Sequence, residues 1–166
     1  MRLKLQPAEV EDAEAVAALR NAVSDDLTFQ HGKGWWTSHS TTAGVLFDRK
    51  NAQLYLALHR DEVVASVVLG TKKPWAIDLK YFSKVPRPLY LTAMVVGPER
   101  QRQGLGRACL AEVMRLARRA KAGAIFLDTF DHPAAGAGPF YAKCGFRECG
   151  RATARGASLV YYELLV

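Results

Sequence analysis

The stretch Val95-Val96-Gly97-Pro98-Glu99-Arg100-Gln101-Arg102-Gln103-Gly104-Leu105-Gly106-Arg107 decides the fold, because it joins a β-prone run to an amphipathic helix. Residues 89–96 are mostly apolar and rich in strand-forming side chains, which predicts a buried strand. From Leu105 to about Lys121, apolar side chains recur at helical spacing on one face. The stretch is therefore predicted to be a strand–loop–helix turn.

Two glycines, Gly104 and Gly106, open the predicted helix, and Arg100, Arg102 and Arg107 surround them. Glycine lets the backbone approach a ligand without a Cβ atom in the way. The first turn of a helix also offers unpaired N–H groups and a positive dipole end, where phosphate groups bind. The turn therefore predicts a pyrophosphate site, although Gly-x-Gly by itself fits an ordinary tight turn equally well.

Two sequence blocks carry a family resemblance. Gln101-x-x-Gly104-x-Gly106 resembles the acyl-CoA pyrophosphate signature of the GNAT superfamily of N-acyltransferases, Gln/Arg-x-x-Gly-x-Gly/Ala, and Val96-Gly97-Pro98 is similar to the Val-x-Pro that ends its central strand. Phe140-Tyr141-Ala142-Lys143-Cys144-Gly145-Phe146 is similar to the Phe-Tyr-x-Lys-x-Gly-Phe near the family's C-terminus. The blocks stand in the family's order over residues 89–146, with a predicted helix and strand between them.

The resemblance implies an N-acetyltransferase that transfers an acetyl group from acetyl-CoA to a primary amine by direct attack in a ternary complex, without a metal. In the family, a β-bulge in the central strand frees a backbone N–H for the thioester oxyanion, and this role falls on Met94. Tyr141 matches the tyrosine that protonates the departing thiolate. Ala134 departs from the pattern, because the family often has asparagine there. The implied cofactor-binding residues are Met94, Val95, Val96, Gln101, Arg102, Gln103, Gly104, Leu105, Gly106 and Arg107.

An amine arrives protonated at neutral pH and must lose a proton before it attacks. Some family members place a glutamate on the central strand for this step, but residues 89–96 contain no carboxylate. One route is a water chain ordered by Thr92, Asp128, Asp131 or His132, with His132 as the expected catalytic base because its reference pKa is near neutrality. In the other, the acceptor binds already neutral from solution.

Length and charge set limits on the class of protein. The chain has 166 residues with 23 basic and 16 acidic side chains, a net charge of +7, which predicts a single N-acetyltransferase domain over residues 1–166. Basic residues gather around the glycine turn, which favours an anionic cofactor. No apolar run has membrane-spanning length and no signal-peptide core follows Met1, so a cytoplasmic protein is expected. Cys109, Cys144 and Cys149 suit reduced thiols and show no zinc-ligand spacing.

Other functions remain open from the residues alone. A non-catalytic acyl-CoA sensor would bind the cofactor without turnover, and a nucleic-acid-binding module would use Arg115, Arg118 and Arg119. A dinucleotide-binding oxidoreductase is disfavoured because the turn lacks the Gly-x-Gly-x-x-Gly form, and a hydrolase because no Gly-x-Ser-x-Gly exists. The expected partners are acetyl-CoA and an amine, either a small molecule or a peptide, without nucleic acid or membrane, for a monomer or homodimer.

The expected fold class is α/β: a GNAT-like mixed, largely antiparallel twisted sheet with a central parallel strand pair and helices on both faces. The parallel pair follows because a helix connects strands 89–96 and 124–130. Further expected strands cover 2–6, 53–59, 63–70, 146–153 and 158–166, and further helices cover 9–24, 41–48 and 139–143.

Residues 71–88 contain three prolines and predict a long loop over a pocket. Aromatic rings gather in this loop and in the irregular segment 25–40. These rings either line an acceptor site near Asp25, Asp26 or Asp78, or anchor their own loops. They belong to Trp35, Trp36, Trp75, Tyr81 and Phe82.

Overall fold

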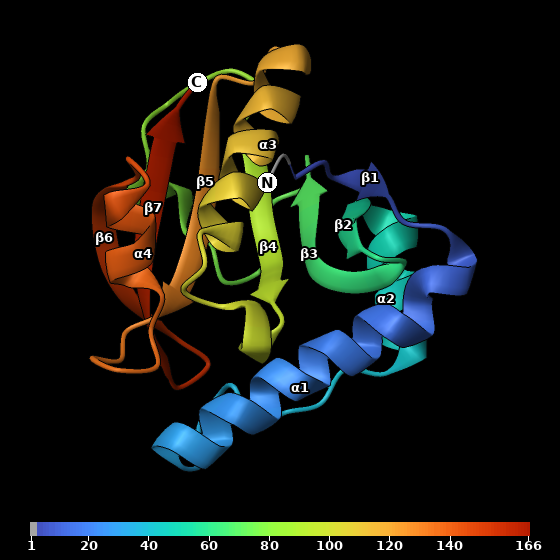
Figure 1. The fold of residues 1–166 in the computed structure, drawn as a ribbon. Coiled ribbons are helices and arrows are strands. Elements are labelled where there is room, and N and C mark those ends of the chain that lie inside the picture. The colour runs from blue at the N-terminus through green and yellow to red at the C-terminus, as the bar shows by residue number, and fades with distance from the viewer. Residues whose placement is uncertain (1–2) are drawn as a thin grey trace.

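A computed structural model describes residues 3–166 of the chain. Seven strands form one twisted sheet in the order β1-β2-β3-β4-β5-β7-β6 (Figure 1). The strands are β1 (Gln6–Pro7), β2 (Gln53–His59), β3 (Glu62–Gly70), β4 (Leu89–Val96), β5 (Ala124–Phe130), β6 (Arg147–Ala154) and β7 (Ala157–Leu165). The α-helices are α1 (Ala13–His31), α2 (Thr42–Asn51), α3 (Leu105–Arg119) and α4 (Gly138–Lys143).

The strand directions confirm the predicted fold class. β4 and β5 are parallel, as the crossover through α3 requires, and the other neighbouring pairs are antiparallel. In Figure 1, α3 and α4 lie in front of the sheet, whereas α2 lies behind β2 and β3. The sheet is therefore mixed, with helices on both faces.

Alternating side chains of the strands supply a core on each face. On one face, Cys109 and Val113 of α3 pack in a cluster with Leu69, Leu91 and Ile125 of the central strands. On the other face, the helices α1 and α2 cover the β2–β3 half of the sheet. That second cluster includes Val16, Val45, Leu54, Leu56 and Val68.

The loop over residues 71–88 is confirmed as a loop, with one turn of 3-10 helix at Leu79–Tyr81. It covers part of the sheet, because Phe82 is buried against Phe126 and Tyr161. Ser83 donates hydrogen bonds from its N and Oγ to the carboxylate of Glu163, at 2.9 and 2.7 Å. The ring of Tyr81 also packs against Tyr161, with centroids 5.4 Å apart, so Tyr81, Phe82 and Ser83 anchor the loop.

Helix α1 differs most from the sequence prediction. It begins at Ala13, after a 3-10 turn, and continues past the predicted end at Ser24 as far as His31, where Gly32 ends it with φ +78°. The side chains of its last turns support it: Thr28 Oγ1 donates to Ser24 O at 2.8 Å, and Gln30 Nε2 donates to an Asp26 oxygen at 2.8 Å. Asp25 and Asp26, which the sequence placed in an irregular segment, therefore lie on α1.

At the N-terminus, strand β1 covers Gln6–Pro7, whereas the sequence predicted a strand over residues 2–6. Arg2, where that strand was predicted to begin, lies outside the described residues. Over residues 3–166, no helix combines the length and apolar character needed to cross a membrane.

Candidate functional site

The two central strands separate part of the way along β4. Their parallel ladder consists of the pairs Leu89↔Ile125 and Tyr90↔Phe126. Tyr90 and Leu91 are buried, but from Thr92 to Val96 the strand is partly exposed, most of all at Ala93. The second half of β4 therefore presents backbone N–H and C=O groups to a gap between the strands, where a ligand can pair with them.

A β-bulge lies within the separated half of β4. Thr92 faces Val68 and Val95 faces Ser66, so Ala93 and Met94 together stand opposite a single residue of β3. Ala93 has φ +47°, in the left-handed region that residues other than glycine rarely adopt. Because a bulge leaves its extra residue outside the ladder, it releases a backbone N–H beside the gap. The bulge lies where the family resemblance implied one.

The glycine turn follows β4 directly. Arg102 and Gly104 are both left-handed, with φ +60° and +83°, and such a turn makes successive N–H groups converge. Ala108 N bonds to Gly104 O at 3.0 Å. The N–H groups of Leu105, Gly106 and Arg107 precede this bond and have no acceptor within the helix. The turn therefore has the geometry of an anion site.

The two glycines of the turn do different work. A Cβ atom at Gly104 would meet no heavy atom within 4 Å, so glycine is required there for its positive φ. At Gly106, a Cβ atom would lie 3.1 Å from Cζ of Phe140. Glycine at this position lets α3 pack closely on the ring from α4. From the sequence, Gly106 was explained only by the close approach of a ligand, so its role in the packing of α3 on α4 was missed.

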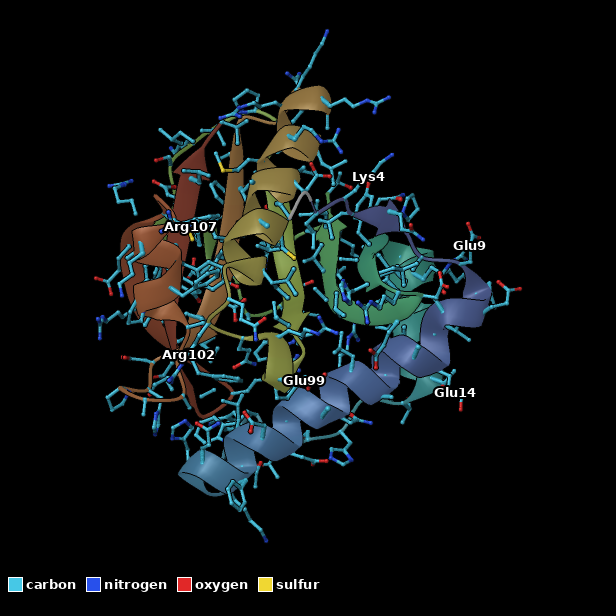
Figure 2. All side chains as sticks on the ribbon, viewed as in Figure 1. Lys4, Glu9, Glu14, Glu99, Arg102 and Arg107 are labelled. Carbon is cyan, nitrogen blue, oxygen red and sulfur yellow. The ribbon has the colours of Figure 1, made fainter. Side chains whose placement is uncertain are left out.

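Positive charge surrounds the turn. Arg102 and Arg107 are exposed, and within residues 3–166 neither they nor Arg100 is ion-paired with a carboxylate. Figure 2 shows Arg102 below Arg107, on the side of α3 that faces α4. Two glutamines brace the turn: Gln101 Nε2 donates to Val96 O at 3.0 Å, and Gln103 Nε2 donates to Glu99 O at 2.9 Å. Guanidinium groups and backbone amides thus remain available to an anion.

Tyr141 brings a hydroxyl group to the bulge. Its oxygen lies 3.9 Å from Sδ of Met94, and its ring packs against Phe146 and Tyr162. Burial, with smaller contributions from Asp128 and Cys144, raises the pKa of Tyr141 above its ordinary value. The phenol is therefore protonated at neutral pH and can donate a hydrogen bond into the gap.

Asp128 lies on β5, opposite Tyr161 of β7. Opposed residues of an antiparallel pair point to the same face, and Tyr161 belongs to the cluster under the loop 71–88. The next pair, Leu127 and Tyr162, points to the face on which Tyr141 packs. The carboxyl group of Asp128 and the phenol of Tyr141 therefore lie on opposite faces of the sheet. Burial raises the pKa of Asp128.

His132 takes part in a turn after β5. Its Nδ1 accepts hydrogen bonds from the backbone N–H groups of Ala134 and Ala135, at 3.1 and 2.8 Å. A neutral imidazole has one accepting nitrogen, and in this turn Nδ1 of His132 accepts from two backbone amides. The base role of His132 stays a prediction, and it requires the ring to release this turn. Ala134 contributes a backbone amide to the same turn.

A cavity of about 600 Å³ lies between the end of α1 and the glycine turn. Its walls include Asp26, Gln30 and His31 of α1 and Arg102 of the turn. The ring of Trp36 packs against His132, with centroids 5.2 Å apart. The sequence did not reveal the α1 side of this cavity, because the helix was predicted to end before Asp26.

Two further tryptophans lie on the surface. Trp35 and Trp75 are each 57% exposed, and the guanidinium carbon of Arg155 lies 4.1 Å from the centroid of the Trp75 ring.

Among the described residues, no group of three or more His, Cys, Asp or Glu side chains could hold a metal ion.

Comparison with known proteins identifies a family. Residues 16–146 match the model of the Acetyltransferase (GNAT) family. No curated protein matches the chain.

Among solved structures, the PaiA N-acetyltransferase of Thermoplasma acidophilum, solved with coenzyme A, is 12% identical, with a TM-score of 0.75 over 100% of both chains. A ribosomal-protein-alanine N-acetyltransferase from Brucella melitensis is 20% identical, with a TM-score of 0.72 over 99% of this chain and 100% of that one. The yncA protein of Salmonella typhimurium, solved with acetyl-CoA, is 15% identical, with a TM-score of 0.70 over 99% of this chain and 94% of that one. At these identities the structures share the fold.

Proposed function

Because the chain belongs to the GNAT family of acetyltransferases, we propose that it transfers the acetyl group of acetyl-CoA to a primary amine by direct attack in a ternary complex. The observation that carries the proposal is the open half of β4. There a separated parallel pair, a bulge at Ala93 and Met94, and a glycine turn follow one another within a single strand–loop–helix unit. Each of these features exposes backbone donors along one path.

The cofactor would follow that path. Its pyrophosphate would lie on the N–H groups at the start of α3, with Arg102 and Arg107 supplying positive charge. Its pantetheine arm would pair with the β4 backbone at Met94 and Val96. The remaining contacts in the proposed cofactor site come from Val95, Gln101, Gln103, Gly104, Leu105 and Gly106. Solved structural neighbours that carry coenzyme A or acetyl-CoA support this choice of co-substrate.

The acyl-transfer step needs a donor for the charge that develops on the thioester oxygen. The N–H of Met94, released at the bulge, would donate to this oxyanion from a fixed position. Tyr141, with its hydroxyl against the Met94 side chain, would donate to the departing thiolate. Because its pKa is raised, the phenol would act first as a hydrogen-bond donor and release its proton only as charge builds on sulfur.

The acceptor amine would approach from the opposite face. Asp128 reaches that face from β5, and its raised pKa makes its carboxylate a stronger base than an ordinary aspartate. We infer that it receives the ammonium proton, directly or through water, and that His132 is the second candidate. The carboxylate of Asp26, in the cavity beside α1, is suited to holding a cationic group of the acceptor.

A thiol-release assay tests the proposal. Acetyl-CoA is offered with a panel of amines that includes amino acid derivatives, polyamines and peptides with free N-termini. We expect free coenzyme A to appear above the enzyme-free rate with at least one class of amine, together with an acetylated amine seen by mass spectrometry. Saturable acetyl-CoA binding without turnover for any amine would instead identify an acyl-CoA sensor, and absence of binding would contradict both.

A further inference from the structure

A second cavity lies at the other end of β4, with a volume of about 680 Å³. Apolar side chains from the residue before β1 and from β2, β3, β4 and α3 contribute to its lining. They are Leu5, Tyr55, Leu69, Leu89 and Leu116. Leu89 and Val96 are the first and last residues of β4, and an extended strand of this length spans roughly 23 Å, so this cavity lies at the end of β4 opposite to the glycine turn. It is therefore separate from the proposed acetyl-transfer site.

Four cationic side chains line this second cavity, and they come from three parts of the chain: Lys4 near β1, Lys50 on α2, and Arg115 and Arg119 on α3. Figure 2 shows Lys4 on the opposite side of α3 from Arg102 and Arg107. The cations therefore form a group distinct from the one at the glycine turn.

One carboxylate neutralises part of this charge. Glu112 accepts hydrogen bonds from Arg115 Nε and Nη2, at 2.9 and 3.1 Å, and from Leu5 N at 3.3 Å. The hydrogen bond from Arg115 lowers the pKa of Glu112. Over residues 3–166, the other three cations form no salt bridge. A surplus of positive charge therefore surrounds an apolar hollow.

We propose that this cavity binds a small anion with an apolar body, of the class of aryl phosphate monoesters. The apolar lining would be buried only by a ligand with an apolar part. The cations Lys4, Lys50 and Arg119, which form no salt bridge within residues 3–166, are complementary to a ligand with more than one negative charge. Because the cations come from separate elements around a hollow, they fit a compact ligand better than an extended polyanion.

Calorimetric titration with three probes tests the proposal: 1-naphthyl phosphate, 1-naphthol and inorganic phosphate. We expect naphthyl phosphate to bind at least about tenfold more tightly than either other probe, because it alone combines the ring with the charge. Raising the salt concentration should weaken its binding. Equal affinity for naphthol and naphthyl phosphate would overturn the proposal, as would the absence of binding by naphthyl phosphate.

Matched variants locate the bound probe. Lys50→Glu and Arg119→Glu, from two walls of the cavity, should each weaken naphthyl phosphate binding about tenfold. Arg118→Glu makes the same charge change beside Arg119 but outside the lining, and should change binding less than twofold. All three positions are exposed, and thermal melts verify that the variants fold. An equal loss in Arg118→Glu, or a loss in Arg102→Glu alone, would place the probe elsewhere and contradict the proposal.

Discussion

The two ends of β4 differ in how their backbone is used. At the closed end, Leu89 and Tyr90 pair with β5, and the ring of Tyr90 packs against Phe126 in the core. At the open end, beyond Leu91, the bulge and the separation from β5 leave the backbone partly exposed. One strand thus combines a fixed support with an open edge. The closed end can hold the open end in place, so substitutions at the two ends should have separable effects.

The largest expected effect is at the turn that follows the open end. Gly104→Asp places a carboxylate where the pyrophosphate is proposed to bind, and forces a side chain into a left-handed conformation with φ +83°. We expect acetyl-CoA affinity to fall by about 100-fold or more, measured by calorimetry.

Gly104→Ala is the control for this prediction. Alanine carries at least as much backbone strain at this positive φ as aspartate, but without the charge, and within the described residues its Cβ atom meets no heavy atom within 4 Å. We expect it to lose distinctly less affinity than Gly104→Asp. Unchanged affinity in a folded Gly104→Asp protein would remove the anion site from the turn and leave the glycine with a conformational role alone.

Substitution of Tyr141 should have the next largest effect, and it should act on the chemical step alone. If its hydroxyl protonates the departing thiolate, Tyr141→Phe should lower kcat by about 100-fold, with acetyl-CoA affinity close to that of the wild type. The ring keeps its packing against Phe146 and Tyr162, and the hydroxyl has only a long contact with Met94 Sδ at 3.9 Å. The melting temperature should therefore change little. Full turnover in this variant would show that the thiolate leaves without a proton from Tyr141.

The sequence predicted the closed end and the turn well, because their signals are local. The apolar run of residues 89–96, the glycines at 104 and 106 and the helical period from Leu105 are each complete within a few residues. The extension of α1 was missed because acidic and polar residues surround Leu27 in its last turns, which also depend on side-chain hydrogen bonds, such as that from Thr28 Oγ1 to Ser24 O. Propensity alone does not contain such contacts.

The face on which each side chain lies depends on contacts between distant parts of the chain. Asp128 is assigned to the face proposed for the acceptor only through its register with Tyr161, and the hydrogen bonds to His132 form only once its turn is folded. The second cavity combines side chains from strands and helices across the fold. No local pattern signals these features, so the motifs led to the cofactor side of the proposed site and left the acceptor side open.

Substitution of the proposed proton acceptor, Asp128, should have a smaller effect, which appears in the pH profile of kcat/KM. Because burial raises the pKa of Asp128, a base role predicts that kcat/KM falls on the acidic side at a pH above the ordinary aspartate pKa of about 3.9. Asp128→Asn should lower kcat/KM about tenfold or more and abolish this limb. His132→Ala is the comparison variant and should keep the limb.

Two other results would reassign the step. An acidic limb near pH 6–7 that disappears in His132→Ala would give the role to His132. A limb that follows the pKa of each amine across a substrate series, and persists in both variants, would show that the acceptor binds neutral and that no protein base is needed.

The smallest expected effect is at the closed end, and it should alter stability without altering the chemistry. Glu163 stands opposite Phe126, the β5 partner of Tyr90. Its buried carboxylate holds the loop 71–88 through hydrogen bonds from Ser83, and Arg147 pairs with it. Burial acts to raise the pKa of Glu163, but the hydrogen bonds from Ser83 and Arg147 outweigh it and hold the pKa below its usual range.

Because that pKa is lowered in the folded protein, the carboxylate stabilises the fold above its unfolded pKa of about 4.3, and this contribution is lost as the pH falls through the lower folded value. Glu163→Gln should therefore lower the free energy of unfolding at pH 7 by about 2 kcal/mol, and the difference from the wild type should shrink in acid. Urea unfolding at pH 7 and at pH 3 measures both. Acetyl-CoA affinity should remain unchanged at pH 7, because the closed end supports β4 without contacting the proposed ligand. A large loss of affinity in a folded Glu163→Gln protein would show that the two ends of β4 are coupled.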